Sequence, residues 1–101
     1  MEDYEVLQER DVELLHSNSQ IIFSAQQLVI FTLLRNPVGK VVSISEIIDA
    51  LKEANPTENP SVSSVKVQIH RIRKKIAAHY EIKTIWYSGY KMNPIRTMAS
   101  L

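Results

Sequence analysis

Five basic side chains on one predicted helix are the residues of this sequence best suited to chemistry, and that chemistry is the binding of phosphates. They lie within residues 61–79, a stretch that contains no aspartate or glutamate to neutralise them. Apolar residues recur there at spacings of three and four, which predicts an amphipathic helix with a basic outer face. Such a face attracts polyanions, although it can also be merely solvated. The five residues are Lys66, Arg71, Arg73, Lys74 and Lys75.

The same helix also carries small and polar residues that could approach DNA bases. Its predicted core stripe is Val62, Val65, Ile69, Ile72 and Ile76. On the other faces stand Ser63, Ser64, Val67, Gln68 and His70. Small residues allow a backbone to come close, while amide and imidazole groups can pair with base edges. We therefore expect Ser64, Val67, Gln68 and His70 to discriminate bases and the cations to set the register on phosphates.

The composition excludes several other classes of function. At 101 residues the chain forms one domain with a single core, and it has no cysteine for disulfides, thiolate zinc sites or nucleophilic catalysis. His16, His70 and His79 lack metal-ligand spacing, and neither Gly39 nor Gly89 belongs to a phosphate-cradling loop. We expect no metal, no cofactor and no enzyme activity. Without a run of about 20 apolar residues or a signal-peptide layout, we expect no membrane contact and a cytoplasmic, nucleoid-associated protein.

The net charge of +1 conceals an acidic segment followed by a basic domain. Residues 1–16 hold six acidic residues and one arginine, whereas the rest of the chain holds eleven basic and five acidic residues. Heptad-like spacing favours an acidic helix over residues 3–16, and a hairpin of residues 12–15 with 20–23 is the alternative. This helix could pack on the domain, pair with a second copy in a homodimer, or compete with DNA for the basic helix.

Two capping boxes predict where two shorter helices begin. Ser24 and Ser43 are each followed three residues later by a glutamine or glutamate. Asn36-Pro37 and Asn55-Pro56 end these helices, because proline disfavours a helical conformation in the residue before it. The β-branched pair Val41-Val42 lies between the two helices and predicts one short strand.

The remaining segments complete the predicted architecture. Residues 55–60 form a turn, which is a candidate contact for RNA polymerase, and residues 82–92 alternate in hydrophobicity around Ser88-Gly89, which predicts a hairpin. The fold class is therefore mainly α with a small β-sheet (α+β), with three helices leading into a C-terminal hairpin. We expect an acidic helix and linker at 1–19, the domain at 20–93 and a flexible tail at 94–101.

Separate segments of the chain resemble the winged-helix effector domain of OmpR/PhoB-type response regulators. The segments are Ser24–Leu28, Leu33–Pro37, Gly39–Ser43, Val65–Ile76, Ile82–Trp86 and Gly89–Lys91. A tryptophan after the wing strand is similar to the branch around the cell-cycle regulator CtrA. The resemblance implies sequence-specific binding of double-stranded DNA by a small transcriptional regulator, with helix 61–79 in the major groove and the wing at 82–92 on the adjacent groove or backbone.

Carried over by position, the resemblance assigns further roles and shows departures from the family pattern. It implies that Thr84 and a tip of Trp86 and Tyr87 lie at the wing, and that Tyr90 belongs to the core. Arginine and glycine are frequent at the two tip positions, so the aromatic pair is a departure. Such a tip can stack on a sugar or wedge a base step, but more often packs on its own domain. No receiver domain is expected before the effector domain, and the alternative function is a protein-interaction module that does not bind DNA.

Overall fold

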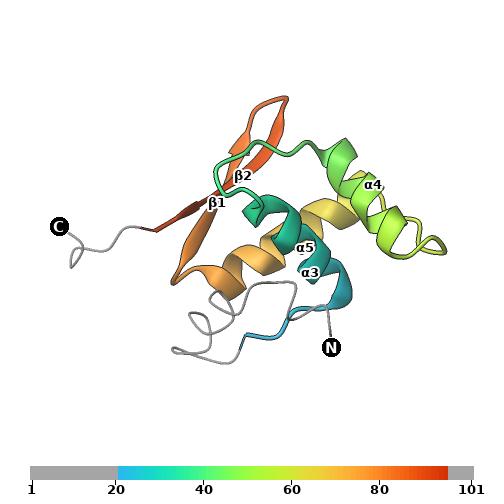
Figure 1. Cartoon of the computed structure of the whole chain (residues 1–101), viewed down its shortest axis with the longest axis horizontal. Helices are drawn as coiled ribbons and strands as arrows, with labels where there is room; N and C mark the ends of the chain where they lie inside the picture. The colour runs from blue at the N-terminus through green and yellow to red at the C-terminus, as the bar shows by residue number, and fades with distance from the viewer. Residues whose placement is uncertain (1–20, 96–101) are drawn as a thin grey trace.

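The structure of the protein, a computed structural model, describes residues 21–95 and contains three helices followed by a β-hairpin (Figure 1). The elements are α3 (Ala25–Arg35), α4 (Ile44–Ala54), α5 (Val62–Ile76), β1 (Tyr80–Ile85) and β2 (Gly89–Pro94). This confirms the predicted α+β winged-helix architecture. The predicted acidic helix at 3–16, its hairpin alternative and most of the predicted tail lie outside the described residues.

Each of the three helices begins with a serine that caps its free N–H groups. The predicted capping boxes are present at Ser24 with Gln27 and at Ser43 with Glu46. A third box, which the sequence did not reveal, joins Ser61 to Ser64 at the start of α5. Each cap satisfies backbone donors that a helix leaves unpaired and is worth about 1 kcal/mol. The helix starts are therefore determined by local sequence.

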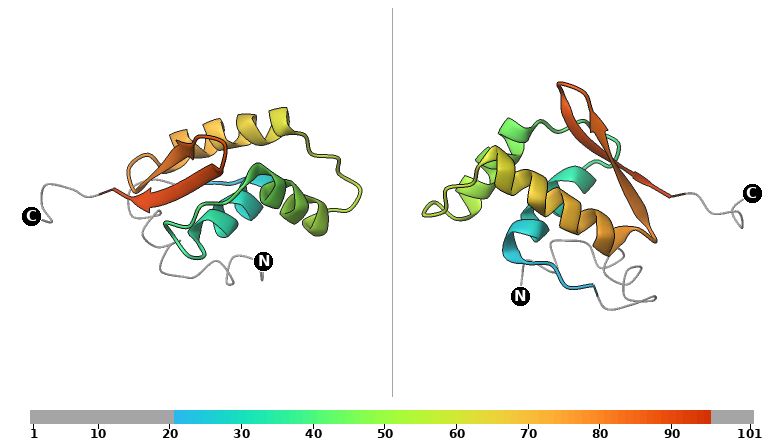
Figure 2. Two further views of the ribbon diagram at one scale, coloured as in Figure 1. Left: turned by 90° about the horizontal axis from the view of Figure 1, so that it is seen from above. Right: turned by 180° about the vertical axis from the view of Figure 1, so that it is seen from behind.

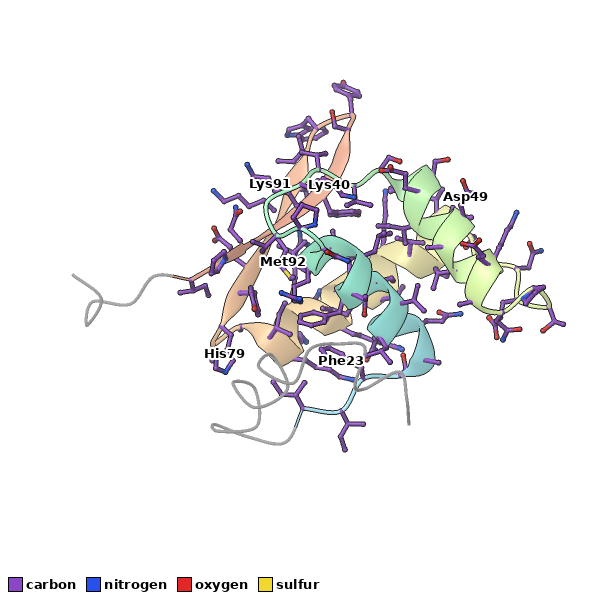
Figure 3. All side chains as sticks on the ribbon, in the orientation of Figure 1. Phe23, Lys40, Asp49, His79, Lys91 and Met92 are labelled. Atoms are coloured by element: carbon purple, nitrogen blue, oxygen red, sulfur yellow. The ribbon has the colours of Figure 1, made fainter. Side chains whose placement is uncertain are left out.

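One apolar core lies between α5, the other two helices and the hairpin. In Figure 2, α5 lies across the near side in the view from behind, with α3 and α4 beyond it and the hairpin beside it. The buried residues are Ile30, Phe31, Leu34, Val42, Ile47, Leu51, Val65, Ile69, Ile72, Ile76, Tyr80, Ile82, Tyr90 and Met92. Figure 3 shows Met92 pointing from the hairpin toward α3. Four of the five predicted core residues of α5 are buried, but Val62 is 49% exposed because it occupies the first, protruding turn.

The hairpin is antiparallel, and its second strand is also bonded to the segment between α3 and α4. Ile82 pairs with Met92 and Ile85 with Gly89, while Val42 forms an isolated bridge with Tyr90 on the other edge of β2. The predicted short strand at 41–42 is thus reduced to one bridging residue. Gly89 allows this approach, since its φ is +137° and a Cβ there would lie 2.0 Å from the carbonyl oxygen of Val42.

The predicted boundaries of the long basic helix, the wing and the tail differ from those in the structure. The helix predicted over residues 61–79 is α5, which ends at Ile76, because the chain must turn through residues 77–79 to enter β1, and the N–H of His79 donates to the carbonyl of Ile76 at 2.8 Å. The strands of the wing extend beyond the predicted 82–92, from Tyr80 to Pro94, since pairing with β1 continues to Pro94. The predicted start of the tail at residue 94 therefore falls within β2.

Candidate nucleic-acid interface

The face of α5 opposite the core is exposed and carries six of the ten α5 residues predicted to contact DNA. These exposed residues are Ser63, Lys66, Val67, His70, Arg71 and Lys74. Val67 is 45% exposed, so an apolar side chain lies within this otherwise polar surface. The first turn of α5 contains no acidic residue, and its last turn contains three basic ones, which suits the helix dipole. The predicted face is thus present as one continuous surface, here called the α5 face.

Three cations of the α5 face have no hydrogen-bond or ion-pair partner among the described residues. Among residues 21–95, no hydrogen bond or ion pair involves Lys66, Arg71 or Lys74. An exposed cation without a carboxylate partner keeps its full charge available for a phosphate. These three side chains therefore form the electrostatic centre of the candidate interface.

Arg73 lies on the side of α5 that faces the hairpin and bonds to it. Its Nε donates to the carbonyl oxygen of Ile82 at 3.0 Å, and its Nη2 donates to Oγ1 of Thr84 at 2.9 Å. The guanidinium also lies 5.9 Å from the ring centroid of Tyr90. Arg73 and Thr84, both predicted to touch DNA, are here joined to each other, and together they fix the wing to α5.

Lys75 also has partners inside the protein. It lies in the last turn of α5, against the segment that precedes α3. Its Nζ donates to the carbonyl of Ile22 and to Oε1 of Gln27, and lies 5.8 Å from the ring centroid of Phe23. Figure 3 shows Phe23 beside the ribbons of α3 and α5. The side chain is half-buried, so its charge serves to hold the segment before α3 against α5.

Gln68 belongs to a chain of hydrogen bonds that crosses between α5 and α3. Lys75 donates to Gln27, Nε2 of Gln27 donates to Oε1 of Gln68 at 3.0 Å, and Nε2 of Gln68 donates to Oε1 of Gln26 at 3.3 Å. Gln26 in turn donates to Oε1 of Glu58 at 2.8 Å. All donors point the same way, from the ammonium to the carboxylate. We call these five residues the glutamine chain.

The glutamine chain was missed by sequence reasoning and changes the surroundings of a predicted base-reading residue. Gln27 is 4% exposed, and it is the one buried polar side chain among the described residues. Its place in a capping box was visible in the sequence, but no local pattern signals its bond to Gln68. Ser64 is similarly engaged, because its hydroxyl accepts from the N–H of Ser61 and donates to the carbonyl of Ser61.

The tip of the hairpin presents two aromatic side chains to solvent. Trp86 is 81% exposed and Tyr87 is 100% exposed, so the tip does not pack on the domain. The N–H of Ser88 donates to the carbonyl of Ile85 at 2.9 Å and closes the turn. Tyr87 has a φ of +65°, a conformation that non-glycine residues rarely adopt. Tyr90, in contrast, is buried in the core as predicted.

The exposed α5 face and the attached hairpin are the parts of a winged helix that meet DNA. A family model described as "Transcriptional regulatory protein, C terminal" matches residues 17–92. The chain belongs to this OmpR/PhoB-type family. Relatives of this domain include the response regulator SaeR from two strains of Staphylococcus epidermidis, each 30% identical over 95 residues. The match covers 90% of this chain and 41% of each relative, so the chain spans about two fifths of their length.

The OmpR/PhoB-type family consists of DNA-binding domains of transcriptional regulators and is not a family of enzymes. Between residues 21 and 95, no helix is long and apolar enough to cross a membrane. The same part of the chain contains no group of three His, Cys, Asp or Glu side chains placed to hold a metal ion.

Proposed function

We propose that this domain binds double-stranded DNA sequence-specifically as a transcriptional regulator, with α5 in the major groove and the wing on the adjacent groove or backbone. The observation that carries the proposal is the α5 face with three cations, Lys66, Arg71 and Lys74, that have no partner within residues 21–95. An α-helix fits the major groove of B-form DNA, and cations on its exposed side then meet phosphates.

The contacts inside the protein divide the predicted DNA-binding residues into two groups. Ser63, Lys66, Val67, His70, Arg71 and Lys74 remain exposed on α5 and are proposed to touch DNA directly. Ser64 is bonded to Ser61 at the start of α5, and Gln68, Arg73 and Lys75 also have protein partners, so we assign these four to positioning α5 and the wing. Within the first group, Lys66 and Lys74 suit phosphates, whereas Arg71 and His70 can donate to base edges.

Fluorescence anisotropy of labelled duplex DNA, titrated at several salt concentrations, tests the proposal. If Lys66 and Lys74 each neutralise one phosphate, log Kd changes with log salt by a slope of about 1.8 or more. Replacing Lys74 with alanine should lower that slope by about 0.9. The matched control is Lys52→Ala, since Lys52 is also an exposed lysine in the last turn of a helix but lies on α4. Equal slopes for both variants would contradict the proposed interface.

Selection of binding sites from a random duplex pool tests sequence specificity. Arg71→Ala should weaken binding to the selected site by about 1–3 kcal/mol and relax preference at one base pair if Arg71 contacts a base edge. An equal loss on all sequences would instead place Arg71 on a phosphate. A folded protein that binds no duplex even at low salt would favour the protein-interaction module.

Two partner assignments remain predictions. A homodimer through residues 3–16 would let two α5 helices read repeated half-sites. The turn at residues 55–60, whose Glu58 ends the glutamine chain, remains the candidate contact for RNA polymerase.

A further inference from the structure

We propose that the aromatic tip of the wing enters the minor groove beside the site bound by α5 and partly unstacks a base step there. This inference rests on the proposed function and adds a second means of recognition. The domain would read how easily the flanking DNA bends, in addition to the base edges that α5 meets. Flexible pyrimidine–purine steps would then be preferred at the flank.

Exposure is the first observation. Trp86 and Tyr87 are the most exposed large hydrophobic residues of the described chain, at 81% and 100%. Their ring centroids lie 6.0 Å apart and their planes meet at 48°, so neither ring is covered by stacking on the other. Apolar side chains that project together in this way are typical of surfaces that bind a partner.

Backbone conformation is the second observation. Tyr87 adopts a φ of +65° at a turn position where glycine would be free of strain. Because its side chain is fully exposed, packing within the described residues does not compensate for that strain. Strained residues of this kind are found where function requires the side chain. The fold therefore does not account for an aromatic residue at position 87.

The third observation is that the hairpin carrying the tip is bonded both to α5 and to the segment before α4. Arg73 bonds β1 to α5, and Tyr90 exchanges two backbone hydrogen bonds with Val42, at 2.8 and 2.9 Å. A hollow of about 410 Å³ at the base of the tip is bordered by Trp86, Tyr87 and the unpartnered Lys66. A DNA strand whose phosphate is bound by Lys66 therefore passes within reach of the two rings.

These placements favour DNA over a protein as the partner of the tip. The hairpin is fastened to α5, which is the most basic helix of the described residues, so the two surfaces face a ligand together. Residues 86–88 carry no cation, so the tip cannot attract phosphates by charge. What it offers is apolar surface, and an apolar wedge inserted between base pairs is a known way to kink DNA from the minor groove.

Trp86 is the single tryptophan of the protein, so its fluorescence reports on the tip alone. We would measure emission and acrylamide quenching of Trp86 during titration with a selected duplex, and follow binding of the same duplex by anisotropy. Insertion should quench the emission and lower the accessibility to acrylamide at least twofold at saturation. End-to-end energy transfer on a doubly labelled duplex should show bending by the wild-type protein.

Variants of the tip give a second readout. Trp86→Ala and Tyr87→Gly should each weaken binding about fivefold to tenfold and reduce the bend, without changing the salt slope, because stacking of an aromatic ring on a base is worth that much or more. Tyr87→Gly should at the same time raise the thermal midpoint, which separates loss of binding from loss of folding. Replacing a flexible flanking step with a stiff A-tract should weaken the wild type but not these variants.

Several outcomes would overturn the wedge. If anisotropy shows binding while Trp86 emission and accessibility stay unchanged, the wedge is wrong and DNA binding by α5 stands. Emission that shifts to shorter wavelength with protein concentration alone, in the absence of DNA, would assign the tip to a protein contact. Absence of DNA binding by the folded protein would overturn both this inference and the proposed function.

Discussion

Arg73 and Lys74 are adjacent cations that the structure assigns to different tasks, and replacing each with alanine should separate those tasks. Arg73 makes two hydrogen bonds to β1, whereas Lys74 has no hydrogen-bond or ion-pair partner among the described residues. Arg73→Ala should therefore destabilise the fold, and Lys74→Ala should weaken the attraction to DNA. Both changes remove one positive charge from the last turn of α5, so they are matched in charge and position.

The magnitude follows from the contacts. A hydrogen bond from a charged donor contributes about 1.5–3 kcal/mol when it is well shielded from water. Arg73 is half-buried and Thr84 is exposed, so we expect a total loss of about 2 kcal/mol for Arg73→Ala. In a domain of this size, such a loss lowers the thermal midpoint by about 8–16 °C. Lys74→Ala should change the stability by less than about 0.5 kcal/mol.

Two assays on the same pair of variants decide the matter. Thermal unfolding followed by circular dichroism gives the stability, and anisotropy at several salt concentrations gives the slope of DNA binding. Arg73→Ala should lower the midpoint and leave the slope unchanged, and Lys74→Ala should do the opposite. A stable Arg73→Ala protein whose salt slope falls by about 0.9 would show that Arg73 meets a phosphate, as the sequence predicted, and would refute the reasoning from its bonds to β1.

Two other perturbations test the attachment of the wing and the glutamine chain. Gly89→Ala should lower the free energy of unfolding, measured in urea, by more than about 3 kcal/mol, because the new Cβ would lie 2.0 Å from the carbonyl oxygen of Val42. Gly39→Ala is the control. Gly39 has a φ of +90° and no atom nearer than 3.6 Å to the new Cβ, so this change should cost only about 1–2 kcal/mol. Similar losses for the two variants would argue against the close approach. Gln68→Ala should cost about 1–3 kcal/mol, since it leaves the buried amide of Gln27 without its acceptor, and should weaken binding equally to all DNA sequences. A change of preference at one base pair would instead show that Gln68 reads DNA.

The start of each helix and the identity of the core were largely readable from the sequence, because they depend on local chemistry. Ser24 and Ser43 each form a capping box with the residue three positions later, and this pattern predicts the start of a helix. The spacing of Val65, Ile69 and Ile72 predicts a buried apolar stripe. The end of α5 was misplaced because residues 77–79 have no helix-breaking residue. The turn there is imposed by the need of β1 to pair with β2, which is tertiary information.

The candidate site was predictable as a face but not as individual roles. Sequence periodicity places Arg73, Lys74 and Lys75 on or beside the outer face of α5 without distinguishing them. Their different roles depend on Ile82, which follows Arg73 by nine residues, and on Ile22, which precedes Lys75 by 53 residues. The exposure of Trp86 and Tyr87 was equally hidden, since an aromatic pair in a turn can fold back onto its own domain or project from it.

The glutamine chain has a consequence for how salt experiments on this protein are interpreted. Its three central residues, Gln27, Gln68 and Gln26, have uncharged amide side chains that join α5 to α3. Ions at moderate concentration screen charges far more than they weaken hydrogen bonds between neutral groups. Only the terminal members, Lys75 and Glu58, carry charge. The position of α5 relative to α3 should therefore be nearly independent of ionic strength. A salt titration then counts the ions displaced from the nucleic acid and does not record a change in the structure of the DNA-binding domain.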